Sequence, residues 1–95
     1  MSILFKELIN QRLRKITVTE LLDYSNQYGF SLDRSQAKDI VSYLKTNNIN
    51  PFTKKERQKM LRQLAEITDG ETAEKANQLF IQLVESYGLS NLFES

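Results

Sequence analysis

The chain has no Cys, no His and no Trp among its 95 residues, and these absences remove whole classes of chemistry. Without Cys there is no disulfide framework and no thiol nucleophile, and without Cys or His the usual zinc sites cannot form. His is also the side chain best suited to proton transfer near neutral pH, so Ser–His and Cys–His catalysis are excluded. We therefore expect no enzyme, no cofactor and no metal site.

Glycine and long apolar runs are scarce as well. Gly29, Gly70 and Gly88 are the three glycines, and they stand too far apart to build a glycine-rich phosphate loop. Charges recur every few residues, so no window approaches the ~20 apolar residues of a membrane span, and the first residues lack a secretory signal pattern. The sequence thus predicts a cytoplasmic protein with no membrane contact and no evident small-molecule substrate.

The net charge of +1 conceals an uneven distribution along the chain. Residues 1–62 carry 12 Lys or Arg and 6 Asp or Glu, whereas residues 63–95 carry 1 and 6. Such asymmetry is consistent with two parts of the molecule that attract each other, or with separate solvated faces.

Apolar residues recur every three or four positions along nearly the whole chain, which is the period of an amphipathic helix. This spacing predicts an all-α fold, a compact single domain over residues 1–95. Because no single stripe can be buried by its own helix, the helices must share one core. The predicted helices span residues 2–14, 18–28, 34–47, 54–68 and 71–87, followed by a tail at 89–95. Their apolar stripes include Leu8 and Ile9, Ser25 and Tyr28, Ile40 and Leu44, Met60 and Leu64, and Phe80 and Val84.

Helix starts are predicted by capping boxes, in which Ser, Thr or Asp is followed three positions later by Glu or Gln. The fourth box is ambiguous, because Gly70 is also suited to end the preceding helix. The four boxes are Thr17–Glu20, Asp33–Gln36, Thr53–Glu56 and Thr68–Glu71. Gly29 and Gly88 are predicted to end helices, and Pro51 to mark a turn after Asn50.

Several of these segments together resemble a family of small bacterial proteins that carry a domain of unknown function. The resemblance rests on Ile16–Ser25, Gln36–Ala37, Ile40–Val41 and Asn48–Phe52, and it covers about residues 10–85. Its motifs are capping and core patterns. The resemblance implies a helical bacterial protein of the cytoplasm, with no catalytic residue to assign.

The segment over residues 54–68 carries the densest positive charge. Lys55 and Lys59 are a like-charge pair at i,i+4, and Lys54 and Lys55 lie in the first turn, at the positive end of the helix dipole. Local helix energetics therefore does not explain this cluster, which also includes Arg62. It is interpreted either as a solvated face or as a surface for phosphates or for an acidic protein.

The tail past Gly88 is apolar and contains Leu89, Leu92 and Phe93. Two interpretations remain open for it: the tail folds back onto the helices, or it forms an apolar patch for a partner or for self-association.

The sequence thus leads to two functional hypotheses. The first is a non-catalytic protein-interaction module, including self-association as a homodimer, with a candidate surface formed by Lys54, Lys55, Lys59, Arg62, Leu89, Leu92 and Phe93. The second is a nucleic-acid-binding protein that uses the basic face of the 54–68 helix.

Overall fold

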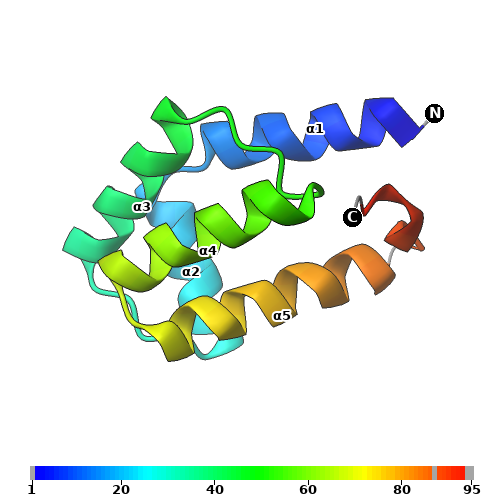
Figure 1. Cartoon of the computed structure of the whole chain (residues 1–95). Coiled ribbons are helices and arrows are strands. Elements are labelled where there is room, and N and C mark those ends of the chain that lie inside the picture. The colour runs from blue at the N-terminus through cyan, green and yellow to red at the C-terminus, as the bar shows by residue number, and fades with distance from the viewer. Residues whose placement is uncertain (1, 87, 94–95) are drawn as a thin grey trace.

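Five α-helices and a short terminal turn of 3₁₀-helix make up the fold (Figure 1). The computed structural model describes residues 2–86 and 88–93, and the side chains of residues 7–82, 84–86, 88–91 and 93. The elements are α1 (Ser2–Lys15), α2 (Val18–Tyr28), α3 (Arg34–Thr46), α4 (Lys54–Ile67), α5 (Gly70–Ser86) and η1 (Ser90–Leu92). No β-strand occurs in this part of the chain, so the predicted all-α class is confirmed.

The first four helices begin at the predicted residues and end within one residue of the predicted ends. At α2 and α3 the capping boxes form as predicted: Thr17 accepts from the Glu20 amide at 3.1 Å, and Asp33 accepts from the Gln36 amide at 2.7 Å. In both, the third-position side chain accepts from the amide of the cap residue in return. Each box needs only residues three apart, so the local sequence is sufficient to set these helix starts.

The predicted box at Thr53–Glu56 is wrong, because Thr53 makes no side-chain capping hydrogen bond to α4. The Glu56 carboxylate instead accepts from the Asn50 amide at 3.2 Å, three residues further back. Asn50 organises this turn: its side-chain oxygen accepts from the Phe52 amide and its carbonyl from the Thr53 amide, both at 3.1 Å. The turn around Pro51 therefore replaces the local cap.

The ambiguity at the fourth box is resolved at Asp69. Thr68 ends α4 and donates its hydroxyl to the Leu64 carbonyl at 2.6 Å, whereas the Asp69 carboxylate accepts from the Thr72 amide at 2.6 Å and caps α5. Gly70 is the first residue of α5 and has no positive φ. Gly29 and Gly88 do adopt left-handed conformations, with φ of 80° and 69°, and reverse the chain after α2 and α5.

The helices pack as two groups that meet at α3 and α4. In the first group α1 and α2 both pack against α3, and in the second α5 packs against α4 and η1 (Figure 1). The radius of gyration of 12.7 Å is close to the roughly 12.4 Å expected for a compact chain of this length.

Two buried clusters form the core. One centres on Ile40, Leu44 and Met60, which the apolar periodicity predicts, and the other on Phe52 and Val84. Phe52 is fully buried although it lies in the turn before α4, so the sequence prediction missed a central core residue. Conversely, the apolar periodicity predicts Leu8 and Tyr28 as core positions, but 57% and 41% of their surface is exposed, because the described elements do not enclose these two side chains. Phe5 and Tyr87, also predicted in stripes, lie outside the described side chains.

Candidate functional site

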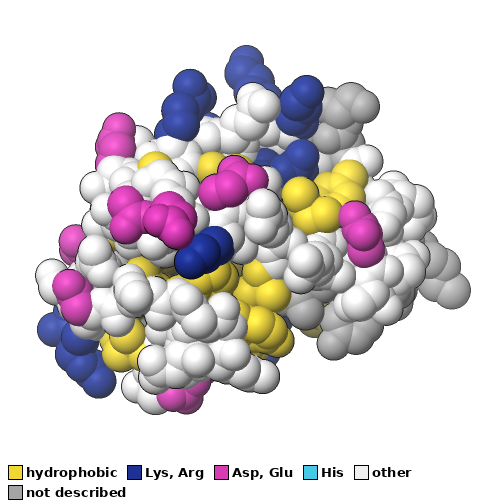
Figure 2. Space-filling model, turned by 90° about the horizontal axis from the view of Figure 1, so that it is seen from below, with side chains coloured by type: hydrophobic (Ala, Val, Ile, Leu, Met, Phe, Trp, Pro, Cys, Tyr) yellow, Lys and Arg dark blue, Asp and Glu magenta, His cyan; other side chains and the backbone are white. Residues whose placement is uncertain are grey.

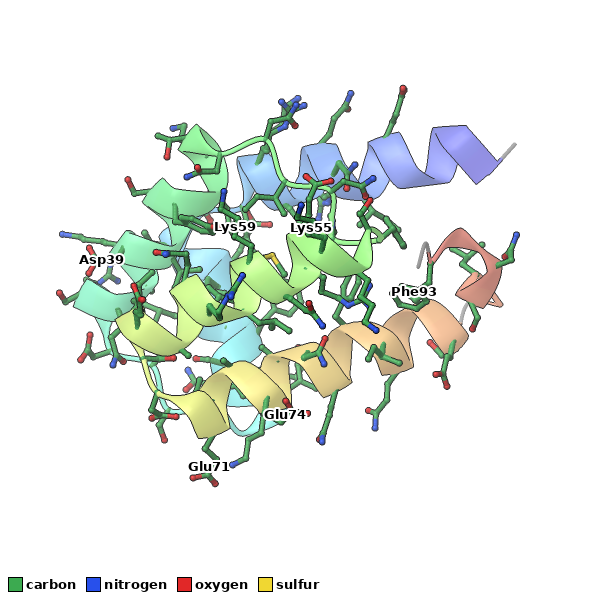
Figure 3. All side chains as sticks on the ribbon, in the orientation of Figure 1. Asp39, Lys55, Lys59, Glu71, Glu74 and Phe93 are labelled. Atoms are coloured by element: carbon green, nitrogen blue, oxygen red, sulfur yellow. The ribbon has the colours of Figure 1, made fainter. Side chains whose placement is uncertain are left out.

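The basic face of α4, defined as Lys54, Lys55, Lys59 and Arg62, is exposed along its whole length. Figure 3 shows Lys55 and Lys59 on α4, with Glu71 and Glu74 on the neighbouring α5. Among the described residues, none of these four cations forms an ion pair. Residues 54 to 62 span about 12 Å of helix, and within this strip Lys55, Lys59 and Arg62 lie within about 60° of one another around the helix axis.

Arg57 lies on the same helix but faces away from this strip. Its guanidinium donates to the Pro51 carbonyl at 3.0 Å and lies 5.0 Å from the centroid of the Phe93 ring. A cation over an aromatic face is attracted by the ring quadrupole. Arg57 therefore joins the α4 turn to the C-terminal tail and does not belong to the exposed basic face.

The tail is folded back onto the helices. Gly88 reverses the chain, the Leu89 amide donates to the Val84 carbonyl at 2.9 Å, and Leu89 and Phe93 pack against the Phe52–Val84 cluster. These two side chains are half-buried, so this part of the predicted interaction surface is turned inward and offers no separate apolar patch. The Leu92 side chain lies outside the described residues.

An apolar cavity, which the sequence prediction missed, separates α5 from α1 and α2. It consists of two adjoining parts of about 380 and 240 Å³, which share Leu13, Ile16, Tyr24 and Phe80 as walls. Figure 2 shows hydrophobic side chains gathered at the surface on one face of the molecule. Tyr24 and Tyr28 lie at the edge of the cavity, with 43% and 41% of their surface exposed and ring centroids 6.5 Å apart. Its residues come from helices far apart in the sequence, and no local motif marks them.

The two parts of the cavity differ in polarity. The larger part, hereafter the outer part, is lined by Arg12, Lys15 and Glu20 in addition to apolar side chains. None of the described residues that line the smaller, inner part is charged, and its hydroxyl groups come from Ser25, Thr68, Thr72 and two tyrosines. The site therefore has one charged end and one apolar end.

Two titrating groups are clearly perturbed in the described part of the molecule. Hydrogen bonds from the Thr72 backbone amide and from its hydroxyl hold the pKa of Asp69 below its ordinary value near 3.8. Burial raises the pKa of Tyr43, which packs against the Ile40–Met60 cluster. Both groups stabilise local structure at a helix cap or at the core edge, and neither lines the cavity.

Neither a metal cluster nor a membrane span appears in the described residues. No three Asp or Glu side chains there come together as metal ligands would. None of the described helices combines the length and the apolar character that crossing a bilayer requires.

The fold and these surfaces define a small all-helical protein with a basic strip on α4 and an apolar cavity beside α5. Residues 1–84 match the family model described as a protein of unknown function, DUF2624, and the chain belongs to that family. It is 48% identical over 80 residues to an uncharacterized protein, YqfT, of Bacillus subtilis (strain 168), covering 84% of this chain and 95% of that protein. No solved structure matches the chain. The predicted resemblance to a small bacterial protein family of unknown function is thus confirmed.

Proposed function

We propose that the protein is a non-catalytic protein-interaction module that binds an acidic surface of a partner through the basic face of α4. The observation that carries this proposal is the set of four exposed cations on one helix, for which no described acid provides an ion pair. Repulsion between Lys55 and Lys59, one turn apart, costs a few tenths of a kcal/mol in an isolated helix. A role in recognition accounts for this cluster of like charges, which lowers the stability of the helix.

The charges around the strip favour a compact acidic partner over an extended polyanion. The neighbouring helix α5 carries Glu71 and Glu74, which are both exposed and lie in its first turns (Figure 3). Glu71 pairs with Lys75 at 3.5 Å, whereas Glu74 forms no ion pair within the described residues. A nucleic acid lying across α4 and α5 would meet these carboxylates, while a small acidic patch would contact the strip alone. We also propose that the protein acts in the cytoplasm. A chain without Cys forms no disulfide bonds and therefore needs no oxidising compartment.

The proposal is tested by photo-crosslinking inside cells. A photoreactive amino acid replaces Lys59 on the basic face, and in the matched control it replaces Gln78, which is exposed on α5. We expect a discrete adduct with another protein from position 59, none from position 78, and loss of the adduct when Lys55→Glu and Arg62→Glu are added. Absence of an adduct at position 59, or equal adducts at both positions, would contradict the proposal.

Nucleic-acid binding by the same face is the second candidate, and its support is the same exposed charge. Neutralising up to four phosphates predicts a log–log slope of affinity against salt of about −3.6 for a duplex. The measurement is fluorescence anisotropy with duplex DNA, single-stranded DNA and RNA between low and moderate salt. If a probe binds with that slope, and the double variant Lys55→Glu/Lys59→Glu no longer binds it, nucleic-acid binding would replace the proposed binding of a protein partner. If all three probes fail to bind at low salt, this candidate is removed.

A further inference from the structure

The apolar cavity beside α5 is separate from the basic face of α4 and has the size of a ligand site. Its parts of about 380 and 240 Å³ adjoin, and small-molecule sites commonly measure roughly 300–1,000 Å³. The wall on α5 includes Ala73 and Ala76, whose small side chains leave this space open. The two parts share four wall residues, so they lie next to each other in the fold.

The inner part has an apolar lining in which the hydroxyls of Ser25, Thr68 and Thr72 already have polar partners within the chain. Ser25 donates to the Leu22 carbonyl at 2.7 Å, and Thr68 donates to the Leu64 carbonyl at 2.6 Å. The Thr72 hydroxyl interacts with the Asp69 carboxylate and helps to lower its pKa. A hydrocarbon chain can therefore enter without leaving these groups unsatisfied, whereas a polar ligand would lose its hydrogen bonds to water.

The outer part presents two cations that form no ion pair with any described residue. Arg12 and Lys15 are three residues apart on α1, both are exposed, and both line the cavity. Glu20 also lines this part, but its carboxylate accepts from the amide and the hydroxyl of Thr17, at 3.1 and 3.0 Å. The charge at this end is therefore net positive, and it complements an anionic group.

We propose that this cavity binds one long-chain alkyl carboxylate, with the chain in the inner part and the carboxylate at Arg12 and Lys15. Charge complementarity selects an anion, and the apolar inner lining selects a chain in place of a compact polar ligand. The cations stand at one end only, which fixes the direction in which the ligand lies. This site is independent of the proposed protein contact on α4.

The first experiment titrates the whole protein with palmitate, and with hexadecanol as the neutral control, below their aggregation concentrations. Isothermal calorimetry gives the affinities, and amide shifts in two-dimensional NMR give the location. We expect palmitate to bind at least tenfold more tightly than hexadecanol. The shifts should concentrate at Tyr24, Ala73 and Ala76, with none at Lys59. Along a series from octanoate to palmitate, each added CH₂ should strengthen binding by up to about fourfold.

Charge variants test the orientation of the ligand. Arg12→Gln/Lys15→Gln should weaken palmitate binding at least tenfold and leave hexadecanol unchanged. Arg14→Gln is the matched control, because Arg14 is exposed at the same helix end but does not line the cavity. Equal losses for Arg14→Gln and for the double variant would show unspecific attraction and overturn the proposal.

A filling variant tests the cavity itself. Ala76→Trp should abolish binding of both probes, whereas Gln78→Trp, exposed on the same helix, should not. If Ala76→Trp does not fold, the NMR map of the unaltered protein decides. Failure of palmitate to bind, or shifts outside the cavity, would overturn the proposal. The proposal would likewise be overturned if light scattering gave twice the mass of one chain and the NMR shifts of the same residues changed on dilution. A second copy of the chain would then occupy the cavity. None of these results bears on the crosslink from position 59.

Discussion

The docking of the C-terminal tail depends on three phenylalanine rings, and this makes Phe93→Ala the most informative perturbation of the fold. Phe52, fully buried in the turn before α4, has its ring centroid 5.6 Å from that of Phe80 and 5.7 Å from that of Phe93. The Phe80 and Phe93 rings meet edge to face at 5.9 Å. Phe93 thus contacts rings from two other parts of the chain.

The expected magnitudes follow from burial. Phe52→Ala should cost about 3–5 kcal/mol, because it removes a fully buried ring and leaves a cavity. The whole protein is expected to have a free energy of unfolding of about 5–14 kcal/mol, so this loss is a large fraction of it. Phe93→Ala should cost about 1–2 kcal/mol, since the ring is only half-buried. The coupling between the two rings should be about 0.5–1.5 kcal/mol.

Urea denaturation followed by far-UV circular dichroism measures all four members of this double-mutant cycle. The dependence of the unfolding free energy on urea should keep the same slope, which shows that the change lies in stability and not in compactness. Leu8→Ala is the control, because Leu8 is 57% exposed and its removal should cost less than about 0.5 kcal/mol.

One outcome would refute the reasoning. If Phe93→Ala costs less than about 0.5 kcal/mol and is additive with Phe52→Ala, the tail is not docked in solution. Leu89 and Phe93 would then be free, and the alternative interpretation of the tail as an apolar contact patch would apply.

Three further predictions concern the caps, the glycines and an unsatisfied amide. The pKa of Asp69 is lower in the folded protein than its ordinary value, so its carboxylate stabilises the fold above about pH 4. This contribution is lost as the pH falls through the lowered pKa. Asp69→Asn should therefore reduce the acid sensitivity of the melting temperature, measured by thermal melts across pH. Gly29→Ala should lower the free energy of unfolding by about 1–2 kcal/mol in urea denaturation, because φ is 80° at this position. Gly70→Ala should raise it by up to about 1 kcal/mol, because Gly70 is in a helical position with open space around it. Equal effects of the two variants would contradict this argument from backbone conformation. Asn77→Leu should raise stability by about 1 kcal/mol, since no described residue donates a hydrogen bond to the buried side-chain oxygen of Asn77. A loss of that size would show that a donor reaches this oxygen.

The sequence alone was sufficient for features that depend on residues a few positions apart. The boxes at Thr17–Glu20 and Asp33–Gln36 form as predicted because their hydrogen bonds close within one helical turn. The same rule failed at Thr53, where the Glu56 carboxylate found the Asn50 amide as a partner outside the four-residue pattern. Local rules therefore hold where no competing donor lies nearby.

Charge on a single helix is also readable from the sequence, as the exposed strip from Lys54 to Arg62 illustrates. Burial is different, because it depends on which other elements come to lie against a residue. Periodicity placed Leu8 in the core, where it is exposed, and gave no sign that Phe52 in a turn would be fully enclosed by Phe80, Val84 and the tail.

The cavity shows this difference most clearly. Arg12 on α1, Tyr24 on α2 and Ala76 on α5 have no pattern in common along the chain, and they come to line two adjoining parts of one cavity only through the packing of the helices. The sequence determined the helices, their caps and the sign of charge on each face, since these depend on neighbours within a turn or two. The tertiary structure decided which turn residue completes the core and which residues line the cavity, since both depend on contacts between segments distant in sequence.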